Sequence, residues 1–422
     1  MNSNSRLPHE PSRRQFLAGS AAGAAALHLP KSVFRSSTET LKIGLIGCGG
    51  RGSGAAQNCV AAAPGMELHA MGDVFADHLN GSKARLAKGL GEAFKVTEET
   101  SFVGFDAYQK VLACDVDLVI LATPPGFRPV HLRAAVEAGK HVFMEKPVAV
   151  DPSGIRSVIE SGEMAKQKGL GIVAGTQRRH DPVYIETMRR IHDGAIGELV
   201  AAQCYWNQGG LWMKQRKPEW SDMEWQLRNW LYFTWLSGDH IVEQHIHNID
   251  VLNWAFQGHP VKAMGMGGRQ VRTDPAYGHI FDHFAVEFEY ENGARVLSMC
   301  RQIDNCANRV SERVVGTGGS SNCNGRILGD SWWRFRGQKV NPYQQEHTDL
   351  IESIRAGTPL NEAKQVAEST MTAILGRMSA YSGKEITWQR GMESTMNLVP
   401  ESLQFGDVTV ADIALPGTSP LE

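Results

Sequence analysis

The sequence predicts a two-domain α/β protein, in which a domain with a doubly wound parallel sheet precedes a larger α/β domain with an open, mostly antiparallel sheet. Apolar runs at 41–46, 66–71 and 116–121 alternate with helical stretches, which is typical of parallel strands joined by crossover helices. Later in the chain, the segments 285–290 and 294–298 flank Glu-Asn-Gly and predict an antiparallel hairpin. The two patterns occupy different halves of the chain, so each predicts its own domain.

The composition is that of a soluble globular protein. With 422 residues, of which 42% are hydrophobic and 21% charged, the chain can bury at least two ordinary cores. The formal net charge is -2 and no long basic run occurs, which argues against a nucleic-acid partner. The seven cysteines form no C-x-x-C pair, so a zinc ribbon is not expected. A small neutral molecule is the expected ligand.

The N-terminus resembles a twin-arginine export signal. Arg13 and Arg14 precede Phe16-Leu17 and a weakly apolar, alanine-rich stretch at 18–29. A disordered tail is the alternative interpretation. The apolar stretch is short for a membrane span, so no permanent membrane anchor is expected. We therefore expect export, to the periplasm or beyond, by the twin-arginine route.

A glycine-rich turn follows the first apolar run. Residues 41–54 read LKIGLIGCGGRGSG, which places Gly47, Gly49 and Gly52 between a strand and a helix. Such a turn lets the backbone approach a pyrophosphate at the helix N-terminus, and is the signature of a Rossmann domain. The neighbouring Gly50 and Arg51 are expected to contact the same dinucleotide.

The second apolar run ends at Asp73, where a carboxylate can accept hydrogen bonds from the adenosine ribose. Asp73 would repel a 2′-phosphate and no basic residue follows it directly, so NAD is predicted in preference to NADP. A solvated turn aspartate is the alternative. Because the twin-arginine route carries folded proteins and NAD is scarce outside the cell, we expect the cofactor to be tightly bound.

Two further strand ends make the resemblance to one family specific. The run at 116–121 ends in Ala-Thr123-Pro124-Pro, a helical stretch around His131 follows, and the next strand closes on Glu145-Lys146-Pro147. This order resembles the Gfo/Idh/MocA family (glucose-fructose oxidoreductase, inositol dehydrogenase and relatives). The resemblance implies that Lys146 lies between nicotinamide and substrate and that the bond before Pro147 is cis. It also implies cofactor contacts for a group of nearby residues: Thr123, Pro124, His131, Glu145 and Lys146.

The chain then returns into its second domain through GTQRRHDPVY. The family resemblance implies that Gln177 approaches the cofactor and that Arg178 approaches the substrate. A solvated loop is an equally good interpretation of these residues.

The segment 238–254 carries the candidate acid-base residues. Its apolar spacing predicts a helix, on which His240, Glu243 and His247 would share one face. In the family, the matching helix carries an acid and a histidine four residues apart, followed by D-x-x-x-W, which implies catalytic and substrate-binding roles for Glu243 and His247. His240 is a further candidate for contact with the substrate. The glutamate, where aspartate is usual, and the added His240 leave the identity of the substrate open.

Three ionisable groups on one helix face allow two other interpretations. Two imidazoles and a carboxylate are a plausible zinc set, and polar residues can also cap a buried helix. The family chemistry needs no metal, so none is expected.

Six of the ten tryptophans lie within 205–235. They could wall a carbohydrate cleft, or belong to a core or a subunit interface.

These features predict four segments: a signal and linker at 1–38, the NAD-binding domain at 39–165, the substrate and oligomerisation domain at 166–390, and a C-terminal tail at 391–422. The resemblance implies an NAD-dependent oxidoreductase that moves a hydride between nicotinamide and a sugar, polyol or cyclitol carbon. The hydroxyl proton would leave through Lys146 and His247, and Glu243 would orient His247 or hydrogen-bond the substrate. It also implies a homodimer or homotetramer. The alternative within the family is a glycosidase that retains NAD, oxidises the sugar transiently, eliminates the aglycone and reduces the product.

Overall fold

The computed structural model describes residues 39–421, so the predicted signal lies outside the described residues. The first sheet is parallel and has six strands in the order β3-β2-β1-β4-β5-β6. Strands β1, β4, β5 and β6 are apolar and almost fully buried, as expected for a sheet covered by helices on each side, whereas the edge strand β3 is half-buried to exposed. The order reverses between β1 and β4, which is where a doubly wound sheet binds its ligand. The strands are β1 (Leu41–Ile46), β2 (Met66–Asp73), β3 (Ser101–Val103), β4 (Leu118–Leu121), β5 (His141–Met144) and β6 (Ile172–Ala174).

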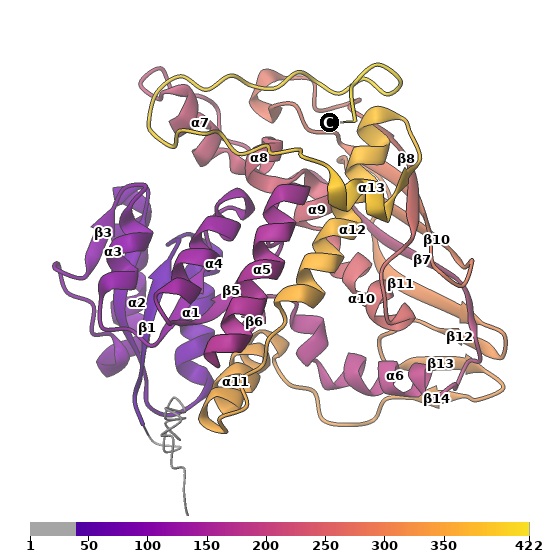
Figure 1. The fold of residues 1–422 in the computed structure, drawn as a ribbon, viewed down its shortest axis with the longest axis horizontal. Coiled ribbons are helices and arrows are strands. Elements are labelled where there is room, and N and C mark those ends of the chain that lie inside the picture. Colours follow the sequence, from indigo (N-terminus) through magenta and orange to yellow (C-terminus); the bar gives the residue numbers. More distant parts are fainter. Residues whose placement is uncertain (1–38, 422) are drawn as a thin grey trace, which may run out of the picture. The chain divides into compact units, whose positions relative to one another are not determined.

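Helices cover both faces of this sheet (Figure 1). One of them comes from late in the chain, because α11 packs against α1 and β6 and so returns to the first domain. The helices of this part are α1 (Gly50–Ala62), α2 (Ala76–Leu90), η1 (Gly91–Ala93), α3 (Ala107–Ala113), η2 (Pro125–Phe127), α4 (Arg128–Glu137), α5 (Pro152–Lys168) and α11 (Pro342–Arg355).

The second sheet has nine strands in the order β14-β13-β12-β11-β7-β10-β9-β8-β15. Only its β7–β10 pair is parallel among the described residues, which confirms the predicted, mostly antiparallel sheet. The predicted hairpin is β9–β10, in which Phe288 pairs with Val296. The strands are β7 (Leu199–Gln208), β8 (Lys262–Gly268), β9 (His283–Glu289), β10 (Arg295–Gln302), β11 (Arg309–Gly316), β12 (Gly319–Ser321), β13 (Arg326–Gly329), β14 (Trp333–Arg334) and β15 (Ile386–Thr387).

The chain passes from β6 of the first sheet to β7 of the second through η3 and α6. None of the helices within 39–421 is long and apolar enough to cross a membrane. The helices of the second part are η3 (Gln177–His180), α6 (Pro182–His192), α7 (Asp222–Arg228), η4 (Trp230–Tyr232), α8 (Thr234–Ser237), α9 (His240–Glu243), α10 (Ile246–Phe256), η5 (Pro275–Tyr277), α12 (Ala363–Ser382) and α13 (Trp388–Glu393).

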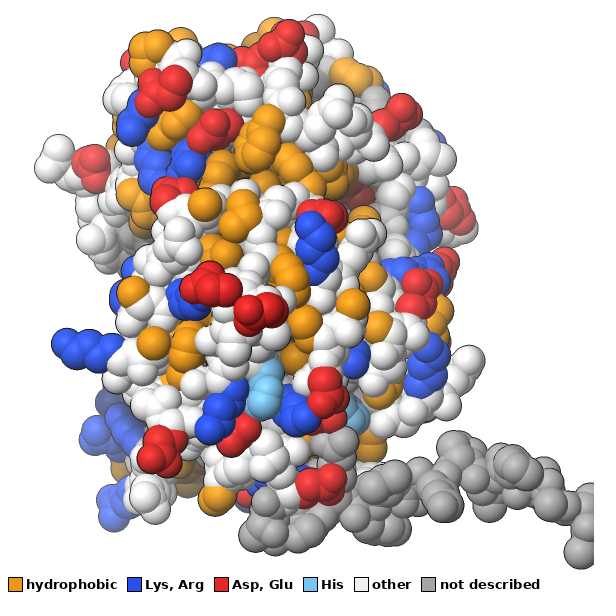
Figure 2. Space-filling view, turned by 90° about the vertical axis from the view of Figure 1, so that its left-hand side faces the viewer, with side chains coloured by type: hydrophobic (Ala, Val, Ile, Leu, Met, Phe, Trp, Pro, Cys, Tyr) orange, Lys and Arg blue, Asp and Glu red, His pale blue; other side chains and the backbone are white. Residues whose placement is uncertain are grey.

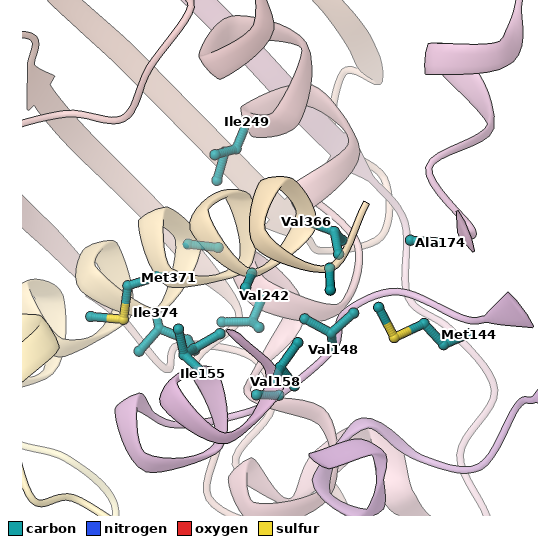
Figure 3. Close-up of a cluster of buried hydrophobic side chains, with 14 of the residues drawn as sticks. Met144, Val148, Ile155, Val158, Ala174, Val242, Ile249, Val366, Met371 and Ile374 are labelled. Carbon is teal, nitrogen blue, oxygen red and sulfur yellow. The ribbon is translucent and has the colours of Figure 1, made fainter. Parts of the chain in front are cut away.

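A central hydrophobic core joins the two parts. Helix α12 is buried along almost its whole length and packs against α5, α10 and β8. In Figure 3, Ile155 and Val158 of α5 lie beside Ile374 of α12 and Val242 of α9. Gly162 permits this approach, because a Cβ there would lie 2.6 Å from the Cβ of Ala363. The segments that carry the site are therefore anchored in one continuous core.

Candidate active site

A cavity of about 550 Å³ lies at the carboxyl ends of β1, β2, β4 and β5, and the second domain closes its other side. Its size is in the range of small-molecule sites. The predicted site residues that line it are Gly47, Gly49, Gly50, Arg51, Gly52, Asp73, Thr123, Pro124, His131, Glu145, Lys146, Glu243 and His247. Gln177, Arg178 and His240 are not among its lining residues.

The glycine loop fits a dinucleotide. Gly47 has a φ of 97°, and a Cβ there would lie 2.6 Å from the backbone of Ala122. A Cβ on Gly52 would lie 1.9 Å from the Gly47 carbonyl oxygen. By contrast, the Cβ positions of Gly49 and Gly50 face open space, at the start of a helix that has no acidic residue in its first turn. The free amides and the helix dipole therefore suit a pyrophosphate.

Asp73 is fixed at the end of β2. Its carboxylate accepts hydrogen bonds from the backbone amides of Cys48 at 2.6 Å and Phe75 at 2.9 Å. Burial raises the pKa of Asp73, while these two amides oppose the rise. The position beside the glycine loop is the one that a ribose-binding carboxylate occupies in a Rossmann domain.

Arg128 holds the ends of β4 and β5 together. This fully buried guanidinium donates to the backbone oxygens of Leu121 at 2.7 Å, Thr123 at 2.6 Å and Glu145 at 2.9 Å. Burial lowers its pKa to about 10. His131 lies one turn along the same helix, 3.2 Å from the Thr123 hydroxyl, and burial, followed by Arg128, lowers its pKa to about 3. His131 is therefore neutral at physiological pH.

Lys146 and Glu243 meet from opposite sides of the cavity. The Lys146 Nζ donates to the Glu243 backbone oxygen at 2.7 Å and lies 3.2 Å from its Oε1. The Lys146–Pro147 peptide bond is cis, as the family resemblance implied. This contact brings the end of β5 against the end of α9.

His247 lines the same cavity from the first turn of α10. Its ring stacks on Trp206 with centroids 5.7 Å apart. Burial lowers the pKa of His247 well below its usual value, and the positive charges of Lys146, Arg178 and Arg51 lower it further. The imidazole is therefore neutral at physiological pH and can accept a proton.

The predicted single helix over 238–254 is two helices. The amide of His245 donates to the His240 carbonyl five residues back, which widens the turn between α9 and α10. His240 and His247 consequently do not share a face. The His240 ring lies 2.9 Å from the Asp239 carboxylate and packs against Phe284, away from the cavity lining. No group of three or more His, Cys, Asp or Glu side chains within residues 39–421 is arranged to hold a metal ion.

Gln177 and Arg178 lie behind the cavity wall. Arg178 forms a buried ion pair with Glu312 and donates to the His247 backbone oxygen at 3.2 Å. Gln177 donates to the Tyr343 hydroxyl at 3.2 Å. Both contacts position residues that do line the cavity.

Several lining residues had no signal in the sequence. Tyr343, on α11, lies with its ring 5.2 Å from the Arg51 guanidinium, which also forms a 2.7 Å ion pair with Glu145. Tyr343 lies far from the glycine loop in the sequence, so only the folded chain shows the contact. Other lining residues that the sequence did not indicate include Phe75, His78, Phe105, Tyr108, Phe127, Arg128, Trp212, Leu227 and Trp230, although the tryptophan cluster as a whole was noted.

Comparisons with known proteins agree with this geometry. Residues 41–175 match a family model described as an oxidoreductase family with an NAD-binding Rossmann fold (GFO_IDH_MocA), and residues 184–322 match the C-terminal domain of the same family. Residues 10–29 match a model of the twin-arginine translocation signal, so the chain carries the signal for that export route.

Individual relatives have low sequence identity to this chain, but the matches extend over most of it. Inositol 2-dehydrogenase 3 of Saccharopolyspora erythraea is 28% identical over 61% of this chain, and the match spans 65% of that relative, slightly less than two thirds. An inositol 2-dehydrogenase of Pseudomonas savastanoi is 26% identical over 75% of this chain and 87% of its own length. A crystal structure of apo scyllo-inositol dehydrogenase from Lactobacillus casei shares the fold, with a TM-score of 0.64 and 20% identity, over 84% of this chain and 100% of that one. The two family models together cover more than half of the chain, and the protein belongs to the Gfo/Idh/MocA family of NAD-binding oxidoreductases.

Proposed function

We propose that the protein is an NAD-dependent dehydrogenase that oxidises a hydroxyl-bearing carbon of a sugar, polyol or cyclitol. The observation that carries this proposal is the convergence of Lys146, Glu243 and His247 on the cavity that the glycine loop forms. Inositol dehydrogenases among the relatives make a cyclitol the first substrate to test.

The side chains divide the work of moving the hydroxyl proton. When bound, NAD would accept a hydride from the carbon that carries this hydroxyl. His247 is the proton acceptor, because its lowered pKa keeps the ring neutral at physiological pH and the residue lines the cavity. An ammonium has three N–H donors, and the Lys146 Nζ directs two of them to Glu243. The remaining donor can hold the substrate oxygen.

In this proposal, two predicted substrate-binding residues do not contact the substrate and instead position residues that line the cavity. Arg178 holds the backbone of His247, and His240 anchors the start of α9 through Asp239. Glu243 fixes Lys146 and can also bind a substrate hydroxyl. Thr123, Pro124, His131 and Glu145 would contact the cofactor along the ends of β4 and β5, and Gln177 would act through Tyr343.

The decisive experiment begins with protein purified without added cofactor. Denaturation and identification of any released nucleotide tests the proposed tight binding of NAD. The native protein is then given NAD with inositols, free sugars and glycosides while NADH absorbance and products are followed. NADH formed from a cyclitol or sugar supports the dehydrogenase. Cleavage of a glycoside without NADH accumulation would instead establish the glycosidase alternative, which the comparisons do not support.

A homodimer or homotetramer remains our proposal for the assembly. The side chains of β10 alternate between buried and exposed, and the exposed ones include Leu297. Met266 on β8 is 70% exposed. Apolar side chains on the open face of a sheet favour association. The molar mass from light scattering, compared between the wild type and Met266→Lys, tests this proposal. Further exposed apolar residues on strands of this sheet are Val200, Met264, Met299, Val310 and Leu328.

A further inference from the structure

The tryptophan-rich segment belongs to a second hydrophobic cluster, which also includes residues of the Rossmann domain. Phe75 follows β2 and Phe127 lies at the start of α4, yet both are buried with Trp225 and Trp235. The Phe127 and Trp235 rings lie 6.0 Å apart. We call this the aromatic clasp, and its buried members are Phe75, Phe127, Met223, Trp225, Leu227, Leu231, Tyr232, Phe233, Trp235, Leu236 and Ile280.

A cation reinforces the clasp. The Arg228 guanidinium, at the end of α7, lies 3.9 Å from the centre of the Phe75 ring and forms ion pairs with Asp77 at 3.0 Å and Glu224 at 2.8 Å. Phe75 and Asp77 flank the start of α2. Arg228 therefore connects the second domain to the element that follows Asp73.

The C-terminal tail covers the clasp from outside. Beyond α13 it runs without regular secondary structure past α7 (Figure 1), where the Gly406 carbonyl accepts from the Met223 amide at 3.0 Å. Gln226 donates to the Val408 carbonyl at 2.9 Å. The Phe405 ring lies 5.1 Å from Phe105 and 6.0 Å from Phe75. Figure 2 shows hydrophobic side chains gathered in the upper part of this face.

The clasp lies over one end of the cofactor cavity. Phe75 and Phe105 line the cavity from the Rossmann side, while Trp212, Leu227 and Trp230 line it from the second domain. Phe75 is two residues beyond Asp73, and its amide donates to the Asp73 carboxylate. This is the end at which a Rossmann domain binds adenosine.

We infer that the aromatic clasp and the tail cover the adenosine end of bound NAD and retain the dinucleotide between turnovers. The inference rests on the proposed NAD-dependent function. Phe405 contacts Phe75 and Phe105, two side chains that line this end of the cavity from the Rossmann side. In this inference, a nucleotide leaves through this end only after Phe405 separates from both rings. Loss of these contacts should therefore speed the release of NAD more than it changes the chemistry at Lys146, which lies at the other end of the cavity.

The test measures release of radiolabelled NAD from loaded full-length protein after addition of excess unlabelled NAD. Phe405→Ala removes the ring contacts at a side chain that is 48% exposed, and Ile413→Ala is the matched control in the same tail at 45% exposure. We expect release about tenfold faster from Phe405→Ala, since an aromatic contact is worth roughly one factor of ten in affinity. Ile413→Ala should release NAD at the wild-type rate.

A second variant, Arg228→Gln, loosens the clasp from within and should also accelerate release. Equal release rates for the wild type, Phe405→Ala and Arg228→Gln would overturn the inference. A wild type that forms NADH from a cyclitol but exchanges NAD as fast as Phe405→Ala would overturn the inference alone. A wild type that takes up no NAD would overturn the proposed function as well.

Discussion

The Lys146 Nζ lies 2.7 Å from the backbone oxygen of Glu243, a residue 97 positions further along the chain. One partner follows a strand of the parallel sheet and the other ends α9 in the second domain. The two side chains are only 11% and 13% exposed, so water competes little with the contact. The contact therefore links the two domains at the reacting end of the cavity.

Lys146→Met should lower kcat by about 10²- to 10³-fold, the range for loss of a donor that holds the reacting oxygen. NAD uptake should change little, because the glycine loop and Asp73 are untouched. Steady-state kinetics and a separate NAD-binding titration measure the two effects. Normal turnover with lost NAD binding would contradict the proposed role of Lys146.

The acid limb of the pH profile of kcat/KM should lie well below pH 6.5. His247 must be neutral to accept a proton, and its lowered pKa keeps it neutral as the pH falls through the usual histidine range. His247→Ala should lose most activity at every pH. A wild-type profile that falls off near pH 6.5 would show that His247 is not the group that limits activity.

Gly52→Ala should abolish NAD binding, because the new Cβ would lie 1.9 Å from the Gly47 carbonyl oxygen. Gly54→Ala, in the same helix, is the control, since no heavy atom lies within 4 Å of its Cβ position. It should bind NAD normally and gain up to about 1 kcal/mol of stability from helix propensity. NAD titration measures the binding of both variants, and thermal unfolding measures their stability. If Gly52→Ala still binds NAD, the turn does not require glycine at this position.

His245 should make the stability of the fold pH-dependent. Burial lowers its pKa to about 3, while the ring lies 2.8 Å from the Ser298 hydroxyl. Between about pH 6.5 and 3 the unfolded chain binds a proton that the folded chain does not, so the free energy of unfolding falls as the pH falls, by about 1.4 kcal/mol per pH unit for this residue.

Denaturant titrations across this pH window measure that slope for the wild type and for His245→Gln. The substitution should reduce the slope of the free energy of unfolding against pH by about 1.4 kcal/mol per pH unit, the contribution of one proton. An unchanged slope would show that His245 is not the source of the pH dependence.

Local patterns predicted the parts of the site that depend on short segments. The turn after β1 requires Gly47 and Gly52. The Glu145-Lys146-Pro147 sequence directly follows an apolar strand, so its place at the end of that strand could be predicted. The alternation at 285–298 was enough to predict the hairpin. The wide turn at His245 was not predictable from spacing, because apolar periodicity continues across it, and this is why His240 was expected beside His247.

Contacts between distant segments were beyond the reach of the sequence. Tyr343 reaches Arg51 only because α11 returns to the first domain, and nothing near either residue signals this packing. The tryptophans were noted as a carbohydrate wall or a core. The structure buries Trp225 and Trp235 in the clasp and leaves Trp212 and Trp230 at the cavity.

Under the inferred role of the tail, retention of the nucleotide depends on the order in which the chain is synthesised. Phe405 is translated after both sheets, so the contact with Phe75 and Phe105 forms only once the preceding domains have emerged from the ribosome. A chain that stops short of this residue has the glycine loop and Lys146 but lacks the outer cover of the clasp. For a protein that leaves the cytoplasm already folded, a chain completed through the tail would thus keep its nucleotide longer than a chain that stops before Phe405.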